Sequence, residues 1–549
     1  MNKKIFANST ATKKVPVADT KNLAGGKAYS MTDEHALAQI ASTGCFGNTY
    51  YANAEDQLEK VLELVKKVDP VFVAKLAVYS RKEGYMKDMP AVLAAYLSTV
   101  DAGLLRKIFA QVVDNGKMLR NFFQAIKSGK FGRTSFGRAP SSLIQGWFDS
   151  HDEDYIFRNS IGNDPSFSDI IHNIHIKPKN KAREALYGYI MGKKVVTNAK
   201  DMVKSKSGKF VTVQEKTLPG IVREYEAFKR FKLDGKKCVG LPDVPFQMLD
   251  SLNLSSEDWK EVAKNAPWHM CRMNLNTFMR HGVFADSEMV TLIADKLKNE
   301  YAIKKSKVFP YQLFSAFTYA DAAMPHAIRE ALQDALDVSL YNVPEMAGNI
   351  VVCPDVSGSM KSPITQARGV ASKIRCVDVA GLVASAILRK NKSARVIPFE
   401  NDVVNIPLNS RDSVMTNAAK LAAVGGGGTC CAAPLVKLIK EDAKVDLIVY
   451  VSDNESWINP ARHTGYGWGR TSTSGTAVMD LFQKLKHKNP NLKMVCIDLT
   501  PNTTLQAPDR KDILNIGGFS DTVFELMDLF HQGLLDAKHW VDVVKKVQL

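Results

Sequence analysis

The sequence predicts a protein of class α + α/β, in which a long helical region is followed by a doubly wound parallel sheet. Amphipathic segments, each of about ten to fifteen residues, follow one another from about residue 31 to 345 with almost no strand-like runs between them. From about residue 348, short apolar runs alternate with helical stretches, which is typical of a parallel sheet covered on both faces. A chain of 549 residues also exceeds the length that one hydrophobic core usually spans.

These patterns divide the chain into three regions. Residues 1–27 are polar and rich in Lys, Thr, Asn and Gly, which predicts a flexible N-terminal arm. Residues 28–346 are predicted to form the helical domain, and residues 347–549 the sheet domain. No apolar run is long enough to span a bilayer, and the basic N-terminus lacks the apolar stretch of a signal peptide. We therefore expect a cytoplasmic protein without a membrane partner.

The helical region places apolar residues at i, i+3, i+4 and i+7 in successive segments, beginning with 54–68, 69–84 and 89–100. Turn signals from Gly, Pro or Asp separate these segments. Further helices are expected at 102–114, 139–149, 180–192, 217–232, 256–265, 285–298 and 309–319. Consecutive helices with short connections favour a solenoid of helix pairs, because the region is long for the alternative, a compact bundle.

The sheet domain begins with the β-branched run GNIVVCP at residue 348. Further strands are expected at 393–400, 445–453 and 492–500, and helices at 376–390, 432–441 and 475–488. Ligands of such sheets bind beyond the carboxyl ends of the strands, so the polar residues that follow each strand are candidates for a site.

Five oxygen-bearing side chains fall at the strand ends or in a loop that leads into a helix. The candidate metal ligands are Asp355, Ser357, Ser359, Thr429 and Asp453. The first three alternate along one loop, in which Gly358 lets the backbone fold closely. Two carboxylates and three hydroxyls are hard ligands, so we expect one divalent cation, Mg²⁺ first and Mn²⁺ or Ca²⁺ as alternatives. Turn and helix-cap roles are the alternative for these residue types.

Two features beside these ligands have alternative interpretations. The glycines at 425–428 are not followed by the Lys of a Walker sequence, because Gly428 precedes Thr429, so we exclude an NTPase. The adjacent Cys430 and Cys431 are the unusual pair among eight cysteines, and a redox role is the less favoured interpretation. The absence of metal-ligand spacing among the cysteines fits a reducing compartment.

The charge is unevenly distributed. Residues 350–549 hold 24 Lys and Arg against 19 Asp and Glu, so the preceding part, with 49 against 38, carries +11 of the formal +16. Such an excess favours a polyanionic partner. Two basic segments, 128–140 and 166–183, supply the candidate RNA contacts. These contacts are Lys130, Arg133, Arg138, His172, His175, Lys177 and Lys179.

The chemistry of these segments fits a nucleic acid. Cations neutralise phosphates, and exposed rings such as Phe131 and Phe136 can stack on unpaired bases. Two alternatives stay open, namely that both rings anchor the loop in the core and that the cations form a solvated face. A metal site at His172 and His175 is the weaker hypothesis, because no neighbouring Asp, Glu or Cys completes a ligand set.

The motif Asp355-x-Ser357-x-Ser359, with Thr429 and Asp453, resembles the metal-ion-dependent adhesion site of von Willebrand factor A domains. In that family the metal completes its coordination with an acidic residue of a partner protein. The resemblance implies that the second domain is von Willebrand A-like and that its metal binds a partner.

The order of the two domains, helical then von Willebrand A-like, resembles the Ro 60 kDa autoantigen family, also called TROVE-domain proteins. Segments that match in pattern are 30–51, 136–148, 169–178, 427–434 and 451–457. The resemblance implies a ring of HEAT-like helical repeats closed by the A domain. It also implies small non-coding Y RNAs on a basic outer surface, single-stranded ends of misfolded RNA in a central hole, and a bacterial exoribonuclease as partner. By position, His175 and Lys177 match an RNA-contacting element of the family, and Arg138 lies in a matching segment.

Three functional hypotheses follow. The leading one is a non-catalytic RNA-binding protein that acts in RNA quality control or degradation. The alternative is a metal-dependent protein-interaction adaptor that uses the A-like domain. A hydrolase, in which the metal activates water, is the third hypothesis. It is the least favoured, because Glu455 is the one residue close to the metal ligands that could act as a general base.

Overall fold

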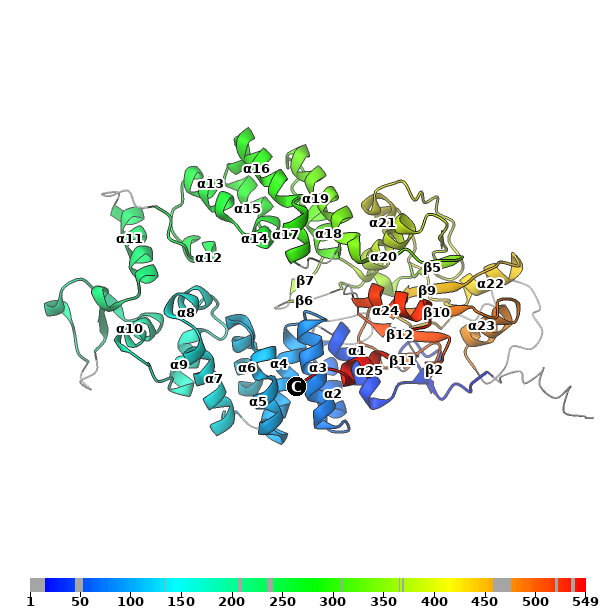
Figure 1. The fold of residues 1–549 in the computed structure, drawn as a ribbon, viewed down its shortest axis with the longest axis horizontal. Helices are drawn as coiled ribbons and strands as arrows, with labels where there is room; N and C mark the ends of the chain where they lie inside the picture. The colour runs from blue at the N-terminus through cyan, green and yellow to red at the C-terminus, as the bar shows by residue number, and fades with distance from the viewer. Residues whose placement is uncertain are drawn as a thin grey trace, which may run out of the picture. The chain divides into compact units, whose positions relative to one another are not determined.

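The computed structural model describes residues 15–44, 53–132, 134–205, 210–234, 240–306, 308, 310–364, 366–367, 370–457, 475–518, 522–534 and 539–549. The chain forms two compact units (Figure 1). The sheet unit comprises residues 1–67 and 340–544, and the helical unit comprises residues 68–339 and 545–549. Within the described ranges, no helix is both long and apolar enough to cross a membrane.

The helical unit is built from short helices that pack on their neighbours in sequence. The helices are α3 (Pro70–Lys82), α4 (Asp88–Val100), α5 (Ala102–Val112), α6 (Gly116–Lys127), α7 (Arg138–Ser150), α8 (Glu153–Asn159), α9 (Phe167–Ile174), α10 (Lys181–Ile190), α11 (Gly220–Asp234), α12 (Phe246–Leu249), α13 (Ser256–Asn265), α14 (Trp268–Met273), α15 (Leu275–Arg280), α16 (Ser287–Leu297), α17 (Glu300–Ser306), α18 (Pro310–Tyr319) and α19 (His326–Ser339). A parallel pair, β3 (Lys194–Val196) and β4 (Thr212–Gln214), follows α10. Helix α3 contacts α4 and α5, and α4 contacts α5 and α6, as in a stack of helices.

Local capping explains where several of these helices begin. Asp69 accepts a hydrogen bond from the Val71 amide at the start of α3, and Pro70 occupies the first turn. Asp101 caps α5 in the same way through the amides of Gly103 and Leu104. These caps are the Asp and Pro signals that separate the amphipathic segments in the sequence.

The sheet unit contains a five-stranded parallel sheet in the order β12-β10-β9-β5-β8. Its strands are β5 (Ile350–Pro354), β8 (Arg395–Val396), β9 (Leu447–Ser452), β10 (Lys493–Asp498) and β12 (Ile513–Gly517). Its helices are α20 (Cys376–Lys390), α21 (Val414–Ala422), α22 (Ala433–Lys440), α23 (Ala477–Lys488), α24 (Thr522–His531) and α25 (His539–Lys545). Pro354 pairs with Val451, and Ser452 with Asp498, so the three central strands end level with one another. The predicted α + α/β class is confirmed, whereas β12 was not expected from the sequence.

The N-terminal residues join this sheet unit, which differs from the boundaries at residues 27 and 346 that the sequence favours. Strand β2 (Lys27–Ser30) pairs on one side with β1 (Thr20–Lys21) and on the other with β11 (Thr504–Leu505). Helix α1 (Asp33–Thr43) packs against β12, and α2 (Ala54–Leu64) packs on α1. Residues 1–14 of the predicted arm lie outside the described residues. The strands β2 and β11 are more than 470 residues apart, so no local sequence pattern predicts their pairing. Helices α1 and α2 have the same amphipathic period as the helical region, which is why the sequence assigns them to it.

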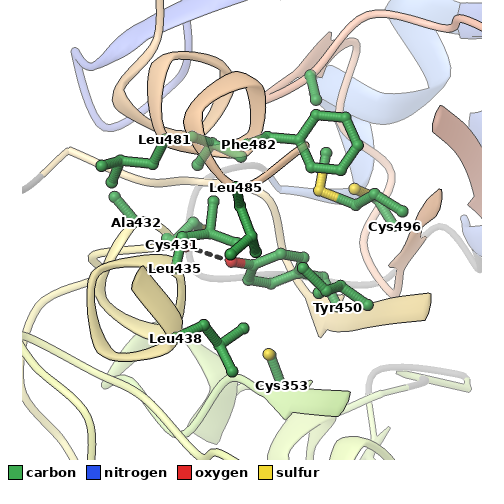
Figure 2. Close-up of a cluster of buried hydrophobic side chains, with 14 of the residues drawn as sticks. Cys353, Cys431, Ala432, Leu435, Leu438, Tyr450, Leu481, Phe482, Leu485 and Cys496 are labelled. Atoms are coloured by element: carbon green, nitrogen blue, oxygen red, sulfur yellow. Dashed lines mark hydrogen bonds between the residues drawn. The ribbon is translucent and has the colours of Figure 1, made fainter. Parts of the chain in front are cut away.

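Tyr450 lies at the centre of a buried cluster between the sheet and helices α22 and α23 (Figure 2). Its hydroxyl donates a 2.8 Å hydrogen bond to the Cys431 carbonyl oxygen. Leu435 and Leu485 lie beside the ring, and Phe399 packs edge-on against it with ring centroids 5.8 Å apart. Burial raises the pKa of the Cys430 thiol to about 11 and holds that of Cys431 well above its ordinary value, so both thiols stay protonated and unreactive. The adjacent cysteines are therefore core residues of the sheet unit.

We predict that Tyr450→Phe destabilises the sheet unit, because it leaves the Cys431 carbonyl without its partner inside the core. A buried, unsatisfied polar group costs about 1–3 kcal/mol. Tyr301→Phe, which removes the same hydroxyl from a side chain 74% exposed, should change the unfolding free energy by less than about 0.5 kcal/mol. Urea unfolding followed by circular dichroism measures both variants, and equal effects would contradict the assignment.

Candidate metal centre and nucleic-acid surface

Four of the five predicted metal ligands, Asp355, Ser357, Ser359 and Asp453, meet at the carboxyl edge of the parallel sheet, and Thr429 lies in a neighbouring loop. Asp355 directly follows β5 and Asp453 directly follows β9, and these two strands are hydrogen-bonded neighbours. Thr429 lies in the connection that leads into α22. Asp355 and Ser357 have no exposed surface, and none of the other three is more than 7% exposed. The strand register thus brings the two carboxylates to one buried place.

The loop after β5 is folded around the Asp355 carboxylate. The Ser357 amide donates to Asp355 Oδ1 at 2.9 Å, and the Ser452 hydroxyl donates to Oδ2 at 2.6 Å. The hydroxyl oxygens of Ser357 and Ser359 lie 3.3 Å apart. Alternating residues of this loop therefore turn their oxygens to the same side, as the spacing Asp-x-Ser-x-Ser predicts.

The glycine run 425–428 packs against this loop and carries Thr429 to it. The Gly358 amide donates to the Gly427 carbonyl at 2.8 Å, and the Gly426 amide donates to the Val356 carbonyl at 3.2 Å. Gly425 has a φ of +88°, and a Cβ there would collide with the Val356 carbonyl. The run is thus required for close backbone contact, in agreement with the exclusion of a phosphate-binding loop.

Two residues that the sequence analysis did not single out hold the glycine run in place. Glu400 Oε2 accepts the Gly427 amide at 2.9 Å, and Asn401 Oδ1 accepts the Gly428 amide at 2.8 Å. Glu400 ends the apolar run 393–400, so its position at a strand end is the signal that could have identified it.

The second carboxylate is fixed by the loop that follows β9. The Glu455 amide donates to Asp453 Oδ1 at 3.2 Å, and the Asn502 side chain donates to the Asp453 carbonyl at 2.7 Å. Asn454, between Asp453 and Glu455, adopts a left-handed conformation with φ of 62°. Its side-chain amide donates a hydrogen bond to the Asp498 carboxylate. Burial raises the pKa of Asp453, whereas the Ser359 hydroxyl lowers it by donating a hydrogen bond.

The electrostatics of the two carboxylates favour a cation between them. Burial raises the pKa of Asp355, and the nearby charge of Asp453 raises it further. A divalent cation would neutralise both groups and take up the hydroxyl oxygens beside them, so the residues fit Mg²⁺ or a similar hard ion. In the described part of the chain, no cluster of three or more His, Cys, Asp or Glu residues is placed to hold a metal. The candidate centre therefore depends on its hydroxyl ligands.

The N-terminal segment covers the loop that carries Asp453. The Ala24 amide donates to Glu455 Oε2 at 3.1 Å, and the Asn22 side chain donates to the Ser456 carbonyl at 2.8 Å. Glu455 is fully buried, and burial raises its pKa to about 7. Gly26 lies so close to this loop that a Cβ would collide with the Ser456 carbonyl oxygen. The segment thus supports the loop that carries Asp453 from the side of Glu455 and Ser456.

We predict that Gly26→Ala loosens the loop after β9, because the added methyl group has to displace either the loop or the N-terminal segment. Overpacking of this kind costs about 1–3 kcal/mol. Hydrogen exchange of the amides at 453–457 should accelerate in this variant. Gly146→Ala is the matched control, because the same methyl group there meets nothing within 4 Å. Unchanged protection in Gly26→Ala would show that the segment does not support the loop.

The predicted RNA contacts lie around α7 and α9 of the helical unit. His172, His175, Lys177 and Lys179 are all exposed, and so are Lys130 and Arg138, whereas Arg133 lies outside the described residues. His175 caps the carboxyl end of α9 with φ of 56°, a left-handed conformation that turns the chain toward α7. The rings of His172 and His175 are 6.3 Å apart.

Hydrogen bonds hold the segment after α9 against α7. The Lys177 amide donates to Gln145 Oε1 at 2.8 Å, and Gln145 Nε2 donates back to the Lys177 carbonyl at 3.1 Å. Lys179 Nζ donates to the Asp149 carbonyl at 2.6 Å, one helical turn further along α7. The backbone of the segment is thus fixed while the Lys177 side chain remains exposed to solvent.

Lys127 extends this group of cations and was not singled out in the sequence. Its ammonium group donates to the Asn173 side chain at 2.6 Å, which ties the end of α6 to α9. Its place in the last turn of a helix, next to the segment at 128–140, is the signal that could have identified it. We call His172, His175, Lys177, Lys179 and Lys127 the basic surface.

Two other side chains of these segments lie in the core, which for Phe136 is the alternative left open by the sequence. Phe136 is buried and stacks on Phe123, with ring centroids 4.6 Å apart, so its ring anchors the loop and is not exposed to a base. Phe131 is half-buried. Arg183, at the end of the second basic segment, is buried and donates to the His151 carbonyl at 2.7 Å and to Glu153 at 3.0 Å. It stabilises the helical unit from within.

Comparison with known proteins agrees with this arrangement. Residues 349–531 match the family model described as the Ro60 vWA domain. The resemblance to the Ro60 family is confirmed. The chain is 22% identical to the RNA-binding protein RO60 of Deinococcus radiodurans, over 96% of this chain and 98% of the relative. It is 21% identical to the RNA-binding protein RO60 of Caenorhabditis elegans over 31% of this chain and 28% of that protein.

A solved structure has the same fold. The crystal structure of the Deinococcus radiodurans RO (RSR) protein aligns with a TM-score of 0.59 and 17% sequence identity, over 92% of this chain and 100% of that chain. The likeness to Ro60 proteins therefore extends from the A-like domain, which the family model covers, to the helical unit.

Proposed function

We propose that this protein binds RNA through the basic surface of its helical unit and that it acts without catalysing a reaction. The observation that carries the proposal is the group of exposed imidazole and ammonium groups around α6, α7 and α9. Hydrogen bonds fix the ammonium groups of Lys127 and Lys179 and the backbone of Lys177 within this group. Contacts from such groups to phosphate oxygens position a nucleic acid. The similarity to proteins named RNA-binding protein RO60 supports the same conclusion.

In this proposal the ligand of the basic surface is a small non-coding, Y-like RNA. Single-stranded ends of misfolded RNA are a second ligand, bound in the central hole that the family resemblance implies. The protein would then act in cytoplasmic RNA quality control or degradation, with an exoribonuclease as its partner. The excess of +11 in the chain before residue 350 supports a polyanionic ligand.

We predict that His175→Ala combined with Lys177→Ala weakens the binding of a small structured RNA by about tenfold, because two phosphate contacts are lost. The matched control is His326→Ala with Lys107→Ala, which removes the same two residue types from exposed positions elsewhere in the helical unit. Filter binding across a salt series measures both. The double variant should also show a shallower dependence on salt, since fewer counterions are released. Equal affinities in the two double variants would remove these residues from the interface.

We further propose that the centre at Asp355, Ser357, Ser359, Thr429 and Asp453 binds Mg²⁺. Mn²⁺ and Ca²⁺ suit the same oxygen ligands. A second function, that of a metal-dependent protein-interaction adaptor, rests on this centre, because a carboxylate from a partner protein can complete the coordination of such an ion. Glu455 is fully buried and bonded to the Ala24 amide, which favours a structural role for it over that of a general base.

We predict that Mg²⁺ raises the melting temperature of the protein and that Asp355→Asn abolishes this response. The substitution also removes a buried charge that Asp453 repels, so in EDTA the variant should melt at or above the temperature of the unchanged protein. Asp412→Asn, at a partly exposed ion pair with Lys420, is the control and should keep the response to Mg²⁺. Differential scanning calorimetry with and without Mg²⁺ gives both readouts, and a full Mg²⁺ response in Asp355→Asn would refute the proposed centre.

A further inference from the structure

A cavity of about 1030 Å³ opens in the sheet unit at the edge opposite to the candidate metal centre. Gly348, Asp446, Asn491 and Asp512 line it, and they precede β5, β9, β10 and β12 respectively. These are the amino ends of the same parallel strands whose carboxyl ends lead into the loops of Asp355 and Asp453. The cavity therefore shares no lining residue with the metal centre.

The charges around this cavity are predominantly positive. Lys486, Lys493, Arg510 and Lys511 line it, against the carboxylates of Asp446 and Asp512. Asp512 is paired twice, with Arg510 at 2.8 Å and with Lys486 at 2.9 Å. Its negative charge is thus already neutralised. The lining keeps a formal excess of two positive charges.

Lys493 is held in a fixed position at the cavity wall. Its ammonium group donates to the carbonyl oxygens of Phe530 at 2.7 Å and His531 at 3.1 Å, at the end of α24. An ammonium group has three donors, so one remains beyond these two bonds. Burial lowers the pKa of Lys493, and repulsion by the charge of Lys486 lowers it further. An anion bound between them would relieve this repulsion.

Lys511 supplies a more accessible cation at the same cavity. It is exposed, next to Arg510 and Asp512 in the turn before β12. The remaining wall includes Pro16, Ala347 and Pro490, which offer apolar surface. Fixed donors on one part of a cavity and apolar surface on another are typical of a small-molecule site, and the volume is in the range such sites occupy.

We propose that this cavity binds a nucleoside monophosphate, with the phosphate at Lys493, Lys486 and Lys511 and the base against the apolar wall. A phosphomonoester carries up to two negative charges and three acceptor oxygens, which match the two excess positive charges and the several donors. An inorganic ion alone would leave most of the volume unfilled. The ligand is either a free mononucleotide or the 5′-phosphorylated terminal nucleotide of an RNA. The site is independent of the basic surface, because it uses no residue of the helical unit.

Titration calorimetry of the full-length protein with AMP tests the proposal. The titrations are carried out in EDTA, so that phosphate cannot bind through a metal at Asp355. AMP should bind saturably and adenosine should not. Lys511→Glu should weaken AMP binding by about tenfold or more, and Lys511→Arg should preserve it. Lys392→Glu is the matched control, because it makes the same charge change at another exposed position of the sheet unit and should leave AMP binding unchanged.

Two oligoribonucleotides of one sequence, with a 5′-phosphate or a 5′-hydroxyl, distinguish the two sources of the ligand. A preference for the 5′-phosphate that disappears in Lys511→Glu identifies an RNA end, whereas AMP binding without such a preference identifies a free nucleotide. Both oligoribonucleotides make the same contacts with the basic surface, so the ratio of their affinities reports only the effect of the 5′-phosphate. Absence of saturable AMP binding, equal binding of adenosine, or equal losses in Lys511→Glu and Lys392→Glu would each overturn the proposal. In a competition assay with labelled AMP, stronger displacement by a polyglutamate peptide than by unlabelled AMP would overturn it as well, because it would show a site for carboxylates.

Discussion

The register between β5 and β9 is the constraint on which the candidate metal centre depends. Because Pro354 lies opposite Val451, Asp355 is one residue beyond this pair and Asp453 is two, so both leave the sheet at the same edge. Two carboxylates are then buried within each other's field, a situation that proteins resolve with hydrogen bonds, protons or a cation.

Hydrogen bonds from the surrounding loops stabilise the buried carboxylates of Asp355 and Asp453 and leave neighbouring hydroxyl oxygens beside them. Each oxygen of Asp355 accepts one hydrogen bond, and the loops that provide Ser359 and Thr429 are held against each other by backbone contacts through the glycine run. The N-terminal segment fixes the third loop from outside, through Glu455 and Ser456. The oxygens proposed as ligands are thus held in place by the backbone, which would reduce the entropy cost of binding the proposed ion.

Much of the sheet unit was predictable, because its strands are buried on both faces and therefore read as continuous apolar runs. Two of these strands end at Asp355 and Asp453, and the loop after the first of them carries Ser357 and Ser359. Strand β12 was missed, since Ile513–Gly517 carries a polar Asn515 in its centre and lies close to a turn. In the helical unit the cations His175 and Lys177 are exposed as expected, whereas Phe136 and Arg183 face the interior. Residue type alone does not distinguish a ring or a guanidinium that contacts solvent from one that anchors a loop.

The sequence by itself determined the two-part class, the order of the parts and the ligand spacing after the first strand, because each of these is encoded in residues that are neighbours along the chain. The tertiary structure alone decided which segments lie together. It paired β2 with β11, placed Glu400 under the glycine run, and gathered Lys486, Lys493 and Lys511 around one cavity. These contacts join residues that are far apart in the chain or unremarkable in local pattern. Only the folded backbone brings their charges and hydrogen-bonding groups within reach of one another.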